Sequence, residues 1–489
     1  MEERSVAVQE RAGTRVSVAI AQGDGIGPQI MESTLKILEA AGAQFDILQV
    51  EMGEQVYQRG ISSGIAQRDL DTLARTGTLL KAPISTPQGG GYKSLNVTIR
   101  KSFGLYANVR PCKALAPYVR TLHPDMDVVI IRENEEDVYG GIEHRQTDDV
   151  TQCLKLITRS GSERIIRYAF EYARANGRSR VTCFTKDNIM KITDGLFHRV
   201  FTEIATEYPD IETNHLIVDI GAARLATQPE QFDVLVLPNL YGDILSDVAA
   251  ELCGSVGMAG SANIGDGFAM FEAIHGCAPD IAGTGTANPS GLLNAAVMML
   301  AHIGQVNVAQ SVHDAWLCAI EDGIHTRDMF GRHSTGCYST AAFTREVIAR
   351  LGMQPRKLEL RRIAAPMHLH PAEATYNDHR PAKKTRHGVD IFVDWRGEAD
   401  VLAESLQSLA VPSLTLSMIS NRGTKVWPNG NPQTRCVDHW RCRFAGDAPT
   451  SQDVVATIAA LAEAGYDVIK TEGLYAFDGN AGYSLGQGQ

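Results

Sequence analysis

Short apolar runs alternate with stretches of helical periodicity along most of the chain. Three runs have the length and composition of buried strands: Val16–Gln22, Arg180–Thr185 and Phe232–Leu237. Apolar side chains recur at helical spacing in Pro28–Ala41 and Ser162–Asn176, and a glycine follows each stretch as a helix stop. Ile217 and Val218 add one more short strand. This rhythm predicts an α/β fold with parallel strands.

The pattern changes near Met353. Residues 353–388 are polar, basic and proline-bearing, which is typical of a linker. The strands and helices predicted beyond it follow the order βαββαβ: Val389–Val393, Glu398–Leu409, Leu414–Ser420, Val437–Phe444, Ser451–Ala464 and Asp467–Thr471. This order predicts a small ferredoxin-like α+β domain over residues 389–489, to which we assign subunit contacts.

Composition narrows the class of protein. A chain of 489 residues can hold two or three domains. It has no stretch of about 18 apolar residues, so no membrane span is expected, and its charged N-terminus does not resemble a secretory signal. A formal net charge of −11 argues against a nucleic-acid partner. Nine cysteines without CxxC pairs fit free thiols in a reducing cytoplasm.

Two carboxylates follow the apolar run that ends at Pro238. Asp243 and Asp247, in NLYGDILSD, are four residues apart and therefore share one face of a helical turn. Gly242 is expected to end the strand, with the helix beginning behind it. Hard oxygen ligands at such a corner suit Mg²⁺ or Mn²⁺. Considered alone, Asp243 could instead cap the helix, and Asp247 could be merely solvated.

Three arginines supply the opposite charge. Arg100 ends the run KSLNVTIR, Arg110 lies in LYANVRP, and Arg132 follows four β-branched residues. A guanidinium at the end of an apolar strand needs an anionic partner. Ordinary ion pairs would explain any one of them. Three arginines together with the acidic pair predict a di- or tricarboxylate bound beside a divalent metal.

Eight motifs in a fixed order resemble the metal-dependent β-decarboxylating dehydrogenases of isocitrate, homoisocitrate and 3-isopropylmalate. They are GDGIGP (23–28), KSLNVTIR (93–100), LYANVRP (105–111), IRENEEDVYGG (131–141), TKDNIMK (185–191), NLYGDILSD (239–247), ANIGDGFAMFEAIHGCAPDIAG (262–283) and ANPSG (287–291). The later runs MISNRGTKVWP (418–428) and VDHWRCRF (437–444) resemble the extra domain of the longer bacterial isocitrate dehydrogenases, such as the Thermus type.

The resemblance implies an isopropylmalate-dehydrogenase-like two-domain fold that is not a Rossmann fold. Pro28 agrees, because it stands where a Rossmann fingerprint has its third glycine. A large domain would hold residues 1–105 and 255–352, and a small domain 106–254 the dimer contacts and metal site. The implied reaction converts isocitrate to 2-oxoglutarate and CO₂, as in the tricarboxylic acid cycle. We expect a homodimer with shared active sites, to which the C-terminal domain could add a higher oligomer.

The family's site residues have counterparts here. The resemblance adds Asp219, from the neighbouring subunit, as a third ligand to a metal that lowers the pKa of the substrate hydroxyl and stabilises the enolate. It assigns the three arginines to the substrate carboxylates. Ser94 and Asn96 would contact the carboxylate that isocitrate alone carries, although Ser94 could also be a plain helix cap.

Tyr139 and Lys186 match the family's acid–base pair. A tyrosine can donate a proton to the enolate carbon, and a lysine near cations has a lowered pKa and can relay protons. Alone, Tyr139 would be a loop anchor and Lys186 a surface charge. The resemblance places Lys186 in the partner subunit's active site.

The coenzyme loop is expected at residues 275–283. The resemblance assigns these residues to coenzyme binding: Thr86, Asn188, His275, Gly276, Ala278, Asp280, Ile281 and Asn288. Asp280 would accept hydrogen bonds from ribose hydroxyls and repel a 2′-phosphate, whereas NADP-using members carry lysine and tyrosine in place of Asp280 and Ile281. NAD is therefore the predicted coenzyme, and Arg327 and Arg332 nearby leave NADP open.

Two alternatives remain. The substrate could be homoisocitrate or 3-isopropylmalate, but the latter should meet apolar residues where Ser94 and Asn96 stand. A regulatory subunit without catalysis should lack a metal ligand or the Tyr139–Lys186 pair, and this chain keeps all of them.

Overall fold

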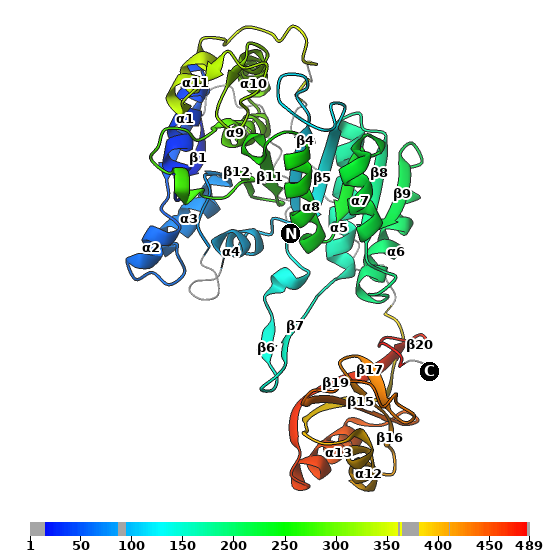
Figure 1. Cartoon of the computed structure of the whole chain (residues 1–489). Helices are drawn as coiled ribbons and strands as arrows, with labels where there is room; N and C mark the ends of the chain where they lie inside the picture. The colour runs from blue at the N-terminus through cyan, green and yellow to red at the C-terminus, as the bar shows by residue number, and fades with distance from the viewer. Residues whose placement is uncertain (1–14, 87–93, 360–361, 364–380, 410, 487–489) are drawn as a thin grey trace, which may run out of the picture. The chain divides into compact units, whose positions relative to one another are not determined.

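The computed structural model describes residues 15–86, 94–359, 362–363, 381–409 and 411–486. They form two compact units, one of residues up to 139 together with 156–374, the other of residues 140–155 together with those from 375 onwards (Figure 1). Most of the predicted linker lies outside the described residues. The predicted division of residues 1–352 into a large and a small domain stays a prediction.

A ten-stranded mixed sheet forms the first unit. Its strands, in spatial order, are β2 (Phe45–Gln49), β1 (Val16–Ala21), β3 (Thr78–Lys81), β12 (Ala269–Ala273), β11 (Gly260–Ile264), β4 (Ala107–Lys113), β5 (Asp127–Glu133), β10 (Val234–Leu237), β8 (Arg180–Thr185) and β9 (Glu212–Ile217). The two ends of the sheet are parallel, and the pairings β12–β11, β11–β4 and β4–β5 in its middle are antiparallel. The predicted α/β class is confirmed, and the antiparallel centre separates this fold from a Rossmann sheet.

Helices cover both faces of this sheet. They are α1 (Gly27–Ala40), α2 (Glu54–Gln58), α3 (Gln67–Thr76), α4 (Leu95–Ser102), α5 (Arg159–Ala175), α6 (Thr193–Ala205), α7 (Val218–Thr227), α8 (Asn239–Leu252), α9 (Ser290–His302), α10 (Val306–Glu321) and α11 (Thr340–Ile348). Alternate strand residues face opposite cores: Val129 and Ile131 pack with α5, α6 and α9, whereas Val128 and Ile130 pack with α7 and α8. A short parallel pair, β13 (Ile324–His325) and β14 (Gly336–Cys337), follows α10.

Helix α8 begins earlier than the sequence suggested. It starts at Asn239, so Gly242 lies inside the helix rather than in front of it, and the prediction that this glycine breaks the strand was wrong. The reason for glycine is close packing. A Cβ on Gly242 would lie 2.6 Å from Cγ and 2.7 Å from Cβ of Arg132. Glycine therefore lets the arginine at the end of β5 lie against the first turn of α8.

The second unit holds the C-terminal domain. Its elements are β15 (Lys384–Asp394), α12 (Ala399–Leu409), β16 (Thr415–Asn421), β17 (Thr424–Trp427), β18 (His439–Ala445), α13 (Ser451–Glu463), β19 (Asp467–Phe477) and β20 (Asn480–Ala481), with the hairpin β6 (Glu143–Arg145) and β7 (Thr151–Cys153). The antiparallel order β16–β18–β15–β19 is that of a ferredoxin-like sheet, as predicted, and β17 and β20 extend its edges. Among the described helices, none is long and apolar enough to cross a membrane.

Candidate active site

Arg132 is the centre of the site. It is the last but one residue of β5, and its side chain is 1% exposed. Its guanidinium donates to Asn239 Oδ1 from Nε at 3.0 Å and from Nη2 at 2.7 Å. Its Nη1 pairs with Asp243. Asn239 lies in the motif NLYGDILSD, and sequence reasoning missed its role. Its amide fixes the plane of the guanidinium from the first residue of α8.

Arg110 reaches the same helix from β4. Its Nε donates to Asn108 Oδ1 at 2.6 Å, and its Nη1 donates to Ser246 Oγ at 2.6 Å. The two terminal nitrogens each lie 3.3 Å from a carboxylate oxygen, one of Asp243 and one of Asp247. Two predicted arginines and both predicted acids thus meet on one face of α8.

Arg100 is held by a group that sequence reasoning missed. Its Nη2 lies 2.9 Å from Glu272 Oε1, and the other oxygen of Glu272 lies 2.6 Å from the buried ammonium of Lys81. Lys81 and Glu272 are register partners on β3 and β12. Burial opposes ionisation of Glu272, but the charges of Lys81 and Arg100 outweigh it and hold its pKa far below the ordinary value. The only sequence signal was a lysine at the end of an apolar strand.

The cluster is electrostatically positive. Burial, followed by the charges of Arg110 and Arg100, lowers the pKa of Arg132 to about 9. For Asp243, burial is outweighed by Arg132 and Arg110, so the pKa of this carboxyl lies below its ordinary value. Buried guanidinium groups that repel one another gain most from an added anion. The arrangement therefore suits a small polycarboxylate.

Tyr139 joins the cluster through Asp243. Its hydroxyl donates to Asp243 Oδ2 at 2.5 Å, and the guanidinium of Arg132 lies 5.0 Å from the centre of its ring. Burial and this hydrogen bond raise the pKa of Tyr139 to about 12. The hydroxyl keeps its proton at neutral pH, as a general acid must.

The predicted metal ligands divide into two groups within one chain. Asp243 and Asp247 have side chains 36% and 62% exposed, so their oxygens can reach a bound ion, and neither caps α8. Asp219, in the first turn of α7, instead pairs with Lys186, with Nζ to Oδ1 at 2.7 Å. Within the described part of one chain, the carboxylates of Asp219, Asp243 and Asp247 do not lie close enough together to bind one ion.

Ser94 and Asn96 open helix α4. Ser94 occupies the N-cap position, but its side chain makes no capping hydrogen bond. Asn96 Oδ1 is buried without a hydrogen-bond partner. An unsatisfied buried amide oxygen in a native fold calls for an explanation. A bound molecule that offers a hydrogen-bond donor would satisfy it.

The predicted coenzyme loop surrounds His275. Its Nδ1 contacts the carbonyl of Gly276 at 3.0 Å, while its buried Nε2 has no partner in the described chain. Asn288 is anchored by Asp328, which accepts from its Nδ2 at 2.8 Å. The other predicted residues of the loop are exposed: Gly276, Ala278, Asp280 and Ile281. Thr86 and Asn188, outside the loop, are also exposed.

The glycine loop GDGIGP braces the coenzyme loop. The amide of Ile26 donates to the carbonyl of Cys277 at 2.9 Å, and a Cβ on Gly25 would lie 2.1 Å from that same oxygen. Gly25 has a φ of 60°, which a side chain would also disfavour. These contacts give the glycine loop a structural role.

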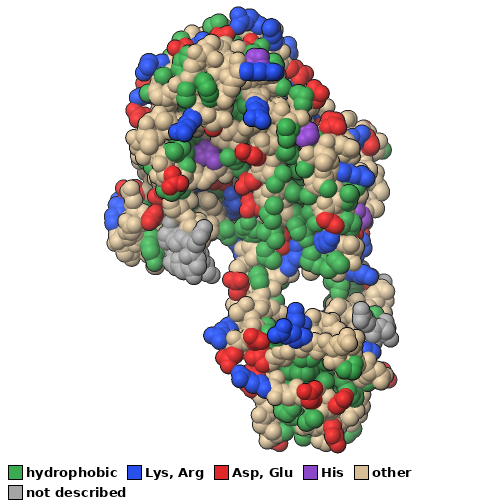
Figure 2. Space-filling view, in the orientation of Figure 1, with side chains coloured by type: hydrophobic (Ala, Val, Ile, Leu, Met, Phe, Trp, Pro, Cys, Tyr) green, Lys and Arg blue, Asp and Glu red, His purple; other side chains and the backbone are tan. Residues whose placement is uncertain are grey.

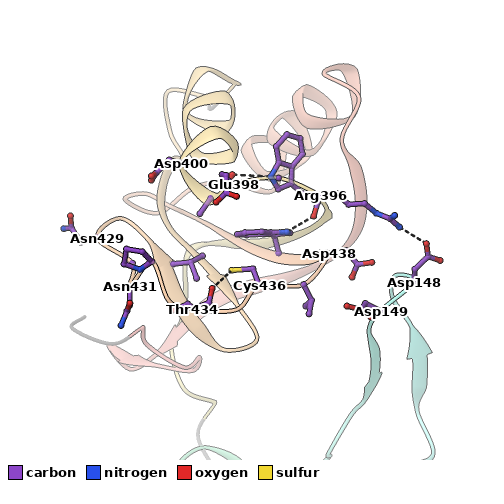
Figure 3. A pocket seen from close by; sticks show the side chains of 18 residues that line it. Asp148, Asp149, Arg396, Glu398, Asp400, Asn429, Asn431, Thr434, Cys436 and Asp438 are labelled. Atoms are coloured by element: carbon purple, nitrogen blue, oxygen red, sulfur yellow. Dashed lines mark hydrogen bonds and ion pairs between the residues drawn. The ribbon is translucent and has the colours of Figure 1, made fainter.

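A further cavity of the described chain lies in the second unit (Figure 3). Its volume is about 1060 Å³, and Trp395 and Trp440 line it. Five carboxylates and one arginine also line it: Asp148, Asp149, Glu398, Asp400, Asp438 and Arg396. Arg396 is already paired with Asp148 at 2.7 Å. An acidic lining repels a polycarboxylate, so this cavity is not the site of the predicted substrate.

Two family profiles match the chain. Residues 17–348 match isocitrate/isopropylmalate dehydrogenase, and residues 384–489 match the C-terminal domain of bacterial isocitrate dehydrogenase. Isocitrate dehydrogenase [NADP] of Rickettsia bellii is 52% identical over 96% of this chain and 99% of its own length. The enzyme of the same name from Thermus thermophilus is 42% identical over 97% and 96%.

A solved structure is similar to this chain over nearly its whole length. The crystal structure of a protein from Thermus thermophilus, 42% identical, covers 97% of this chain and 96% of its own with a TM-score of 0.90. The resemblance to the long Thermus type is thereby confirmed. The relatives' names, however, contradict the NAD preference predicted from Asp280, because these relatives are named for NADP.

Proposed function

This chain belongs to the isocitrate/isopropylmalate dehydrogenase family, and we propose that it catalyses the metal-dependent oxidative decarboxylation of isocitrate with NADP as hydride acceptor. The observation that carries the proposal is the convergence of Arg110 and Arg132 on Asp243 and Asp247, beside Arg100. The match of the C-terminal domain to the bacterial isocitrate enzymes supports the same substrate.

The arginines bind and orient the substrate. Asn239, Asn108 and Glu272 hold their guanidinium groups in place before isocitrate arrives, so little side-chain entropy is lost on binding. The hydroxyl of Ser94, which makes no capping hydrogen bond, and the amide Nδ2 of Asn96 would donate hydrogen bonds to the carboxylate that 3-isopropylmalate lacks. This pair selects isocitrate.

Asp243 and Asp247, with Asp219 of the partner subunit, would hold Mg²⁺ or Mn²⁺, and their hard, exposed oxygens fit either ion. Bound there, the ion would lower the pKa of the substrate hydroxyl and stabilise the enolate. Arg110 and Arg132 keep Asp243 ionised in the absence of the ion. Tyr139 delivers its proton to the enolate carbon, and Lys186 relays the proton of the hydroxyl.

A second copy of the chain completes the site. Five large apolar side chains are exposed in the segment after Lys186, in α7 and in the neighbouring helix α8: Ile189, Ile192, Ile220, Ile244 and Val248. Helices α7 and α8 lie side by side, and hydrophobic side chains gather over them on the surface (Figure 2). A surface of this kind is typical of an interface. Through it, Lys186 and Asp219 would reach the partner subunit's site.

NADP is supported by the names of relatives that match nearly the whole chain. Arg327 offers a cation beside the coenzyme loop, because the next residue, Asp328, accepts a hydrogen bond from Asn288. Asp280 would then lower NADP affinity by repulsion, and Asp280→Asn should raise kcat/KM for NADP.

Initial rates test the proposal directly. Isocitrate, homoisocitrate and 3-isopropylmalate would be compared at equal metal concentration, each with NADP and with NAD. We expect turnover with isocitrate and a higher kcat/KM with NADP. Faster turnover of another 2-hydroxy acid would overturn the substrate assignment, and a higher kcat/KM with NAD would overturn the coenzyme assignment alone.

A further inference from the structure

A second group of metal-binding side chains lies outside the site described above. Asp187 follows β8, His198 lies in α6, and His215 lies in β9. One ligand atom from each residue lies within 4.8 Å of the others. In the described chain no other group of three or more such residues is so placed. None of the three has a role in the proposed reaction.

The three side chains already contact one another. His198 Nδ1 lies 2.6 Å from Asp187 Oδ2, and the two imidazole rings stack with their centres 3.5 Å apart and their planes 14° apart. Two stacked imidazoles repel each other when both are protonated. The pair is therefore stable when at least one ring is neutral, which is the form that binds metal.

The charge states favour a cation. Burial opposes ionisation of Asp187, but the hydrogen bond from His198 and the nearby imidazoles outweigh it and hold the pKa of this carboxyl below its ordinary value. Burial, followed by the charge of His198, lowers the pKa of His215. At neutral pH the group thus offers one carboxylate and a neutral imidazole, which are the protonation states of metal ligands.

A hydrogen bond to a buried threonine also fixes the orientation of the His215 ring. Its Nε2 lies 2.8 Å from the hydroxyl of Thr185, a fully buried residue. Histidines that bind metals commonly use the second ring nitrogen for such a hydrogen bond, which fixes the orientation of the ring. Nδ1 of His215 is then the nitrogen available to an ion.

We propose that Asp187, His198 and His215 form a binding site for Zn²⁺ or a similar borderline divalent ion, distinct from the Mg²⁺ or Mn²⁺ site. A tetrahedral zinc ion needs its ligand atoms about 3.3 Å apart. The present spread within 4.8 Å needs a contraction and a turn of one stacked ring. All three side chains are half-buried, which leaves room for that turn and for water as the fourth ligand.

Binding there would act on neighbours of the active site. Asp187 stands between Lys186, the proposed proton relay, and Asn188, a predicted coenzyme contact. The amide of Lys186 is held by Asp194 at 2.7 Å, at the start of α6, and His198 lies in the same helix. An ion would fasten the Lys186–Asn188 turn to α6 and β9, and so raise the melting temperature.

Zinc binding to the full chain tests this, with Mg²⁺ in excess to fill the acidic site. Equilibrium dialysis and calorimetry would compare the wild type with His198→Gln and His215→Gln. His144→Gln is the matched control, because His144 is exposed on β6. We expect the two site variants to bind one zinc ion fewer per chain than the wild type and the control. All four proteins should retain isocitrate turnover in the absence of zinc, which shows that they are folded.

Two further measurements separate this site from other zinc ligands. Co²⁺ in the wild type should give visible bands of nitrogen and oxygen ligation without the charge-transfer band of a cysteine thiolate. Thr185→Val should weaken zinc binding by roughly 10–100-fold, since it removes only the orienting hydrogen bond. Equal zinc stoichiometry in the wild type and both histidine variants would overturn the proposal, as would a thiolate spectrum that both variants share.

Discussion

Gly242→Ala should damage catalysis far more than it damages stability. The new methyl carbon would lie 2.6 Å from Cγ of Arg132, whereas carbon atoms rest at about 3.5–4.0 Å, so Arg132 or α8 must move by about 1 Å. Overpacking of this kind costs about 1–3 kcal/mol, and alanine in a helix returns about 0.5–1 kcal/mol. The net loss of folding free energy is therefore about 0–2.5 kcal/mol.

The active site tolerates that movement less well. Arg132 binds Asn239 and Asp243 at the same time, so its displacement misplaces both a substrate ligand and a metal ligand. A displacement of about 1 Å can cost about 100-fold in rate. We expect kcat/KM for isocitrate to fall by about that factor.

Urea unfolding and steady-state kinetics on the same preparation would measure both effects. Gly267→Ala is the matched control, because a methyl group there meets no atom within 4 Å. The reasoning is refuted if kcat/KM of Gly242→Ala stays within twofold of the control, or if the variant loses activity only because it unfolds.

Three other changes separate the proposed roles. Asp243→Asn should abolish Mn²⁺-dependent turnover while circular dichroism stays native, and near-normal activity at saturating metal would remove it from the metal site. Arg100→Ala should raise KM for isocitrate, because the loss of a buried charge-assisted contact weakens the free energy of substrate binding by about 2–5 kcal/mol. An unchanged KM would show that this arginine serves only as a structural partner of Glu272. Tyr139→Phe should cut overall turnover yet retain coenzyme-dependent reduction of oxalosuccinate, because its proton belongs to the decarboxylation half; equal loss in both assays would contradict that division.

The sequence predicted elements best where local pattern and burial agree. β8 was predicted to the residue, because an apolar run there is bounded by polar turns on both sides. β17 was missed. It is joined to β16 by Arg422 and Gly423, which have φ values of 50° and 81°, and arginine is an unusual residue at a left-handed turn position. The hairpin is therefore set by pairing with the rest of the sheet rather than by its own turn residues.

Site residues could be predicted where they follow an apolar strand in the sequence. Contacts that depend on which strands are neighbours in the sheet could not be predicted. Arg132 could be found because it comes directly after an apolar run, and Asp243 because it shares a short polar motif with Asp247 behind another such run. The ion pair of Lys81 with Glu272 could not, since it joins neighbouring strands β3 and β12 whose order in the sheet no local pattern reveals. The cluster of Asp187, His198 and His215 escaped for the same reason, because its members come from three elements.

The pairing of Lys186 with Asp219 inside one chain has a genetic consequence under the proposed dimer. Each chain would contribute Lys186 and Asp219 to the active site of its partner, and its own active site would need the same two residues from the partner. A lone newly made chain would be catalytically silent, and activity would vanish on dilution before the fold does. Two different defective alleles, one altered at Lys186 and one at Asp243, would complement each other, because each mixed dimer rebuilds one intact site from the sound half of each chain.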